Sequence, residues 1–281
     1  MVLESIVEPS DACRHPYKIA LLAAVFVSIG IAGALLLSSE ANGILLIMLV
    51  AIPSIPMILK LFEYEEGNVE ARARFAGSRT LARHFSVLVV LMSYFLGLCI
   101  AFTCWYVVLS PEQTQTIFSS QVNELKAIRA SFQGFAVQND INEMAFETIF
   151  LHNLQVGVII VAFSLLYGAG AIFVLVWNAS VIGAFLGGLG KSELLHTADA
   201  AITNVGMGVL GILPHGLFEL LAYSTAALAG GIISQAVIRK AYGKPEFGQI
   251  LYDTLKLFAW AVVFLAIGAL IESTGAPAAA S

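Results

Sequence analysis

The chain contains 281 residues, of which 59% are hydrophobic and only 12% are charged, and it has a mean hydropathy of +0.88 and a formal net charge of −5 at pH 7. This composition excludes an ordinary soluble fold and indicates a protein that crosses the membrane several times. The sequence has no basic patch interleaved with aromatic residues, which argues against a nucleic-acid partner.

The first two apolar runs predict a membrane hairpin within residues 1–62. The run from Lys18 to Leu37 has about the 20 residues that a helix needs to cross the bilayer core. The second run, from Gly43 to Phe62, contains Pro53 and Pro56, each of which removes a backbone donor and bends a helix.

Residues 63–84 follow as a linker rich in Glu and Arg, which we expect to be a solvated helical connector in the cytoplasm. A third span is predicted over Phe85–Leu109, and it ends with Trp105 and Tyr106, where interfacial aromatic side chains are expected. Residues 85–281 then form the main membrane domain.

The polar section after the third span contains an amphipathic helix at about 117–135. Apolar side chains recur there every three or four residues and form one stripe, which consists of Phe118, Val122, Leu125, Ile128, Phe132 and Phe135. Such a stripe must be covered by the protein's own bundle, the membrane surface, a second copy or a foreign partner.

The next apolar segments are rich in glycine and irregular in length. Asn153–Val176 predicts a fourth span that is interrupted at Trp177-Asn178 and continues to Gly190, as in transporters whose broken helices form midplane sites. The segment 200–213 is short for a crossing, whereas 217–238 and 251–271 are full spans. The predicted fold is an all-α, polytopic membrane bundle of about seven transmembrane helices, including one broken and one short helix.

The distribution of Lys and Arg predicts the orientation of this bundle in the cell membrane. With seven crossings, the N-terminus and the linkers around 60–84, 191–199 and 239–256 lie on one side with 12 of the 14 basic residues, and only Lys126 and Arg129 lie on the other. Because basic residues favour the cytoplasm, the N-terminus should be cytoplasmic and the C-terminus external.

The stretch Leu213–Glu219 places a proline, a histidine, a glycine and a carboxylate between two apolar runs. It is either a helix-helix turn near the bilayer surface or part of a polar site. The polar residues near membrane depth that could share such a site are His152, Asn153, Asn178, Asn204, His215, Glu219 and Glu272. On the predicted topology, Asn153, His215 and Glu272 belong to span ends in one leaflet. We expect no catalytic residues, no metal and no cofactor, because zinc-hydrolase and nucleophile motifs are missing.

Three pieces of this sequence together resemble the stage II sporulation protein M (SpoIIM) family. The first is the stretch Ile149–Leu154, which includes Asn153 and starts a glycine-rich span that reaches Asn178. The other two are the stretch Leu213–Glu219 and the pair Ile271-Glu272 before Pro277. The resemblance covers about 85–277, and the preceding hairpin and linker are similar to those of longer, archaeal members. Family members usually have Asn-Asn at 152–153 and Asn-Gly at 178–179, where this chain has His-Asn and Asn-Ala.

The resemblance implies a multi-span protein with a role in assembly, because the family member of spore-forming bacteria is the membrane scaffold of a complex with two peptidoglycan-degrading proteins. The first hypothesis is therefore a non-enzymatic scaffold in the lipid bilayer, which docks other membrane or surface proteins, or a second copy in a homo-oligomer, through the apolar stripe. A channel or transporter that uses the polar residues is the alternative, and a metal-dependent membrane hydrolase is the third.

Overall fold

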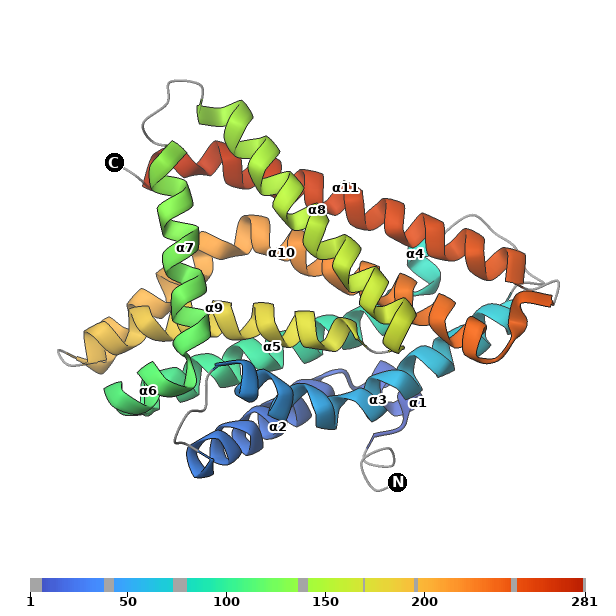
Figure 1. The fold of residues 1–281 in the computed structure, drawn as a ribbon, viewed down its shortest axis with the longest axis horizontal. Coiled ribbons are helices and arrows are strands. Elements are labelled where there is room, and N and C mark those ends of the chain that lie inside the picture. The colour runs from blue at the N-terminus through green and yellow to red at the C-terminus, as the bar shows by residue number, and fades with distance from the viewer. Residues whose placement is uncertain are drawn as a thin grey trace.

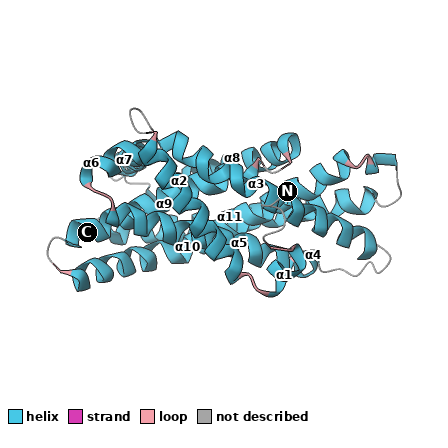
Figure 2. Cartoon of the chain, turned by 90° about the horizontal axis from the view of Figure 1, so that it is seen from below, coloured by secondary structure: helices cyan, strands magenta, loops and turns pink. Residues whose placement is uncertain are grey.

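The computed structural model describes residues 7–37, 43–72, 80–135, 141–168, 170–194, 197–243 and 247–279, and within them the chain is helical with no strand. Seven helices are long and apolar enough to cross a membrane, which confirms the predicted fold class (Figures 1 and 2). They are α2 (Tyr17–Leu36), α3 (Gly43–Arg72), α5 (Phe85–Val108), α8 (Ile141–Tyr167), α9 (Ala171–Leu194), α10 (Ala198–Ile238) and α11 (Phe247–Ala279).

Short helices lie at the ends of these long ones. They are α1 (Pro9–Arg14), α4 (Thr80–Arg83), α6 (Pro111–Ile117), α7 (Ser119–Phe135) and the 3-10 turn η3 (Ala241–Gly243). In Figure 1, α5 and α9 lie lengthwise in the bundle, α8 crosses it diagonally, and α7 crosses one end at a steep angle to α5 and α9. The structure thus has an end built by α6 and α7 and an opposite end built by α4 and η3.

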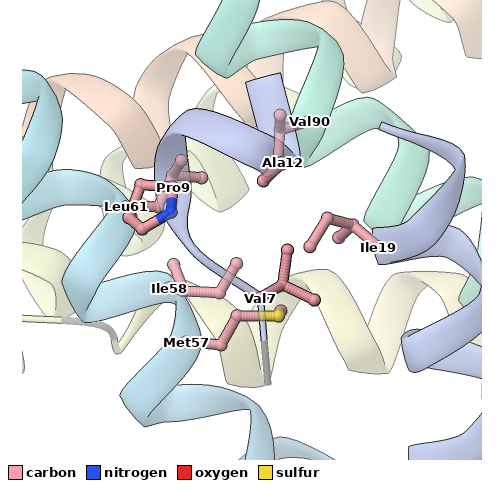
Figure 3. A pocket seen from close by; sticks show the side chains of 8 residues that line it. All are labelled: Val7, Pro9, Ala12, Ile19, Met57, Ile58, Leu61 and Val90. Atoms are coloured by element: carbon pink, nitrogen blue, oxygen red, sulfur yellow. The ribbon is translucent and has the colours of Figure 1, made fainter. Parts of the chain in front are cut away.

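Helix α1 packs into the angle between α2, α3 and α5. Its side chains and those of the neighbouring helices leave only a small apolar cavity of about 10 Å³, which is lined by Val7, Pro9, Ala12, Ile19, Met57, Ile58, Leu61 and Val90 (Figure 3). The Lys18 ammonium donates to the Asp11 carboxylate at 2.7 Å, and this hydrogen bond lowers the pKa of Asp11. The cavity has the size of about one water molecule, so it is too small for an organic ligand.

The glycine-rich region is divided differently from the prediction. The chain reverses at Gly168, whose φ of +73° favours a residue without a Cβ, and a Cβ at Gly170 would overlap the backbone of Phe163. The turn therefore separates α8 from α9, and the predicted break at Trp177-Asn178 is wrong because both residues lie within the continuous helix α9. What was predicted as one broken span is two antiparallel helices.

The predicted short span 200–213 and the full span 217–238 are also wrong as separate segments, since they form the single 41-residue helix α10 with Pro214 in its interior. Proline is tolerated in membrane helices when the backbone groups that it frees find other partners. At a rise of 1.5 Å per residue, α10 is about 61 Å long. One predicted span is thus divided into two helices, and two predicted spans form one helix. The total therefore remains seven, the number expected from the sequence.

The second half of α10 is the centre of the bundle. Residues 222–232 are all buried, and the helix packs against α3, α5, α8, α9 and α11. Small residues permit this close packing, because a Cβ at Gly230 would overlap Ser164 and one at Gly231 would overlap Phe62. The first half of α10 is mostly exposed, as Ile202 and Leu210 show.

Candidate functional site

A polar cluster joins α8, α10 and α11 within the membrane-spanning part of the bundle, and we call it the Asn153 cluster. Asn153 on α8 is 7% exposed and donates through Nδ2 to Oε1 of Glu219 on α10 at 2.6 Å. The Tyr223 hydroxyl, one turn further along α10, donates to Oδ1 of Asn153 at 2.9 Å. One buried amide thus holds two side chains of the neighbouring helix.

Helix α11 closes the cluster from a third side. Gly268 lies against α10, since a Cβ there would be in van der Waals contact with Glu219, Phe218 and the His215 carbonyl at 3.4–3.6 Å. Glu272 follows one turn later on the same face of α11, close enough to Glu219 for their charges to interact. Two carboxylates near each other at membrane depth repel unless one is protonated or a cation lies nearby.

The structure therefore brings together Asn153, Glu219 and Glu272 from the predicted set, with the His215 backbone beside them and its side chain half-buried. Tyr223 was missed, because a tyrosine within an apolar run resembles ordinary core. His215 and Glu219 lie on one continuous helix, so the turn interpretation of Leu213–Glu219 is wrong.

Three other predicted residues lie outside the Asn153 cluster. His152 is exposed on α8 and points in a different direction from Asn153, since consecutive helical residues do not share a face. Asn178 donates to the Val174 carbonyl of its own helix at 2.8 Å. Asn204 is half-buried on α10, 11 residues before His215 and hence about 16 Å away along the helix.

A second group of polar residues, which we call the Asp253 network, lies at the opposite end of the bundle. Asp253 on α11 is fully buried and accepts from the Arg83 guanidinium at 2.6 Å and from the Gln249 amide at 3.1 Å. Beside it, His84 Nδ1 lies 2.7 Å from Glu65 Oε1, and His84 Nε2 lies 4.0 Å from Asp253 Oδ2.

The same network extends to the end of α10. The Arg239 guanidinium is 2.7 Å from the Glu63 carboxylate and 2.8 Å from that of Glu66, and Glu66 is fully buried. Three buried carboxylates, those of Glu65, Glu66 and Asp253, therefore face two guanidinium groups and one imidazole. The network ties α3, the start of α5, α10 and α11 together.

The Asp253 network contradicts the expectation that 63–84 is a solvated connector. Helix α3 continues past the predicted end at Phe62 to Arg72, and Glu65, Glu66 and His84 are buried. The signal was present in the sequence: Leu61 and Phe62 are followed by Glu65 and Glu66 at a spacing of four, so the acidic residues continue the buried face of the helix. Because both residues are charged, the sequence predicts a solvated linker at these positions and not the buried face of the helix.

The apolar stripe of α7 is covered at its first half by the protein's own bundle. Phe118 is fully buried and packs edge-to-face against Phe102 and Tyr106 of α5, and Val122 and Leu125 pack against the same core. Ile128 is 36% exposed. The side chains of Phe132 and Phe135 lie outside the described part of the structure.

Polar contacts fix the same end of α7. The buried Gln121 amide donates to the Gly43 carbonyl at 3.3 Å and to the Ser180 hydroxyl at 3.1 Å, which connects α7 to the start of α3 and to α9. Among the described side chains, no three His, Cys, Asp or Glu residues converge in a way that could hold a metal ion.

Comparison with known proteins gives one family and one distant relative. The family model described as stage II sporulation protein M matches residues 22–277. A protein of Methanocaldococcus jannaschii, described only as uncharacterized, is 29% identical over 130 residues, which cover 45% of this chain and 68% of the relative. No solved structure matches the chain.

Proposed function

Because the chain belongs to the stage II sporulation protein M family and folds into a seven-helix membrane bundle, we propose that it is a non-enzymatic membrane scaffold that presents helix α7 to a partner. The observation that carries this proposal is the asymmetry of α7. Phe118 and Gln121 anchor its first turns, whereas Ile128 leaves a large apolar side chain exposed further along. A helix that is anchored at one end and exposes an apolar side chain further along is suited to docking.

We place α7 on the external face of the membrane. The new division of the helices moves the loop between α9 and α10 to the side of α7, because the Lys191 ammonium donates to the Leu109 carbonyl at the end of α5. Eleven of the 14 basic residues then lie on the opposite side and three, Lys126, Arg129 and Lys191, on the α7 side. The positive-inside rule still assigns the N-terminus to the cytoplasm and the C-terminus to the exterior.

The scaffold proposal is tested by photo-crosslinking in native membranes. A photoreactive residue at position 128 should give adducts with a partner protein or a second copy, whereas the same residue at Thr116, exposed on α6, serves as the matched control. Ile128→Asp should reduce the mass of the detergent-solubilised complex, and Thr116→Asp should leave it unchanged. A complex of equal mass in all three proteins, without adducts from position 128, would contradict docking through α7.

The Asn153 cluster supports a second candidate function, the passage of a proton or small cation. Its motivation is the presence of two carboxylates, Glu219 and Glu272, near each other at membrane depth. In proteoliposomes, flux through the wild-type protein should fall at least about ten-fold in Glu219→Gln and Glu272→Gln and persist in Asn178→Ala, whose amide bonds only to its own helix. Equal leak in all four proteins would leave the cluster a structural clamp.

A further inference from the structure

An open cavity of about 590 Å³ lies between α5, α6, α7 and α9 at the α7 end of the bundle. It is lined by Tyr106, Pro111, Thr114, Gln115, Ser119, Val122, Asn123, Lys126 and Lys191. The only charged residues in this wall are the two lysines, so the cavity is a concave, cationic surface next to the end of a membrane helix.

The positive charge of Lys191 is fixed in position and is not neutralised by a carboxylate. Its ammonium donates to the carbonyls of Tyr106 at 3.3 Å and Leu109 at 2.6 Å and to the Thr114 hydroxyl at 2.6 Å. All three acceptors are uncharged, and the last carbonyls of α5 carry only a partial negative charge. Within the described residues, neither Lys191 nor Lys126 forms an ion pair, so most of two positive charges remains at the cavity.

Three further polar side chains of the wall can donate hydrogen bonds and have none within the described parts of the chain. They are the Ser119 hydroxyl and the amides of Gln115 and Asn123. An ammonium pair with neutral donors around it matches a group that carries full negative charge and several acceptor oxygens, which is the chemistry of a phosphate. The cavity has room for a larger molecule that carries a phosphate group, and not only for an inorganic phosphate ion.

We propose that this cavity binds the phosphate of a phosphate-bearing ligand, with Lys126 as the charged group that contacts the phosphate directly and Lys191 as a fixed positive charge beside it. The phosphate can come from a phospholipid head group or from a soluble phosphate compound. A second open cavity of about 460 Å³ at the same end of α5 and α9 is almost wholly apolar, with Val107, Gly190 and Ile202 in its wall. Acyl chains can lie there beside the head-group cavity, which makes the lipid the first probe.

The test uses the full chain and two probes. Retention of phosphatidylglycerol from nanodiscs of phosphatidylcholine with a minor share of phosphatidylglycerol, read by native mass spectrometry, reports the lipid. Titration of the detergent-solubilised protein with inorganic phosphate, read by calorimetry, reports a soluble ligand. Lys126→Gln should weaken binding about three-fold and Lys126→Glu about ten-fold, because one or two units of charge change at an exposed position.

Lys256→Gln is the matched control, since it removes the same charge at the opposite end of the bundle, where Lys256 lies over the Tyr252 ring. It should bind both probes as the wild type does. Lys191→Met should also weaken binding, but it removes contacts that hold α5 and α6, so the exposed Lys126 variants decide the question.

Weaker binding in the Lys126 variants, with unchanged binding in Lys256→Gln, supports the site. The probe whose binding is weakened identifies the source of the phosphate. Equal binding in Lys126→Glu and the wild type, equal loss in Lys256→Gln, or no saturable binding of either probe would overturn the proposal. Docking through Ile128 is read by a different measurement, so either proposal can fail alone.

Discussion

At the scale of single residues, the Asp253 network buries three carboxylates, those of Glu65, Glu66 and Asp253, next to cationic side chains. Burying a carboxylate is unfavourable unless charged and polar donors surround it, and Asp253 obtains these from Arg83, Gln249 and Thr80. Breaking such a buried pair from one side leaves the partner's charge without compensation. The network therefore makes the four helices that meet there depend on one another.

We predict that Asp253→Asn lowers the free energy of unfolding by about 2–4 kcal/mol, because the amide keeps the shape and removes the charge that Arg83 faces. Denaturant titration in detergent micelles measures the change. Asp199→Asn, at an exposed position in the first turn of α10, is the control and should cost less than about 0.5 kcal/mol. Similar losses in the two variants would show that the network contributes nothing beyond surface electrostatics.

The sequence identified Asn153, Glu219 and Glu272 as polar residues at membrane depth but could not show that they meet. Their meeting depends on how α8, α10 and α11 are rotated, which is set by close contacts such as the one at Gly268. Asp253 was not singled out at all, because a carboxylate near the end of a span normally lies in water. Only the three-dimensional path of α3 brings His84 and Glu65 to it.

At the scale of helices, close backbone contacts at glycine decide which pairs form. Gly97 on α5 is the clearest example, because a Cβ there would overlap the backbone of Ala20 on α2. Without this contact, α5 could not approach the hairpin closely, since membrane helices associate mainly by packing and not by a hydrophobic effect between them.

We expect Gly97→Ala to destabilise the protein by about 1–3 kcal/mol, because α2 and α5 must move apart to admit the methyl group. Thermal unfolding monitored by circular dichroism provides the comparison. Gly211→Ala, on α10 with nothing within 4 Å of an added Cβ, should instead raise stability by up to about 1 kcal/mol through helix propensity. An equal response at both positions would mean that the α2–α5 contact is not tight.

The helix boundaries between 153 and 238 were the least predictable part of the fold. A proline close to a glycine, as at Pro214 and Gly216, is the usual signal of a turn, yet α10 continues through both. The true turn at Gly168 lies in a run of small and apolar residues that carries no proline and no charge. Local composition could not distinguish the turn at Gly168 from the continuous helix at Pro214, because the continuity of α10 depends on how its second half packs in the bundle.

At the scale of the whole molecule, the orientation in the membrane follows from which loops share an end. The structure places Ser192 near the α7 end and Tyr242 in η3 at the opposite end, both exposed. The sequence had grouped the two loops on one side, because it read α8 and α9 as a single crossing. The total of seven crossings and the predicted positions of the termini are the same under both arrangements.

We predict that Ser192→Cys reacts with a membrane-impermeant maleimide in intact cells and that Tyr242→Cys reacts only after the cells are opened. The measurement requires a background in which Cys13, Cys99 and Cys104 are replaced, since none of the three forms a disulfide within the described part of the chain. Labelling of both positions from the same side would contradict a single crossing by α10, which lies between them.

The length of α10 ties the protein to the thickness of its membrane. A helix of about 61 Å is twice as long as a hydrocarbon core of about 30 Å, and its first half exposes apolar side chains over several turns. An upright α10 would push these side chains into water, whereas keeping all of it in lipid requires a tilt of about 60° or a locally thickened bilayer. Lipid chain length therefore becomes a thermodynamic variable for this protein, and changing it should reorient the first half of α10 relative to the buried second half.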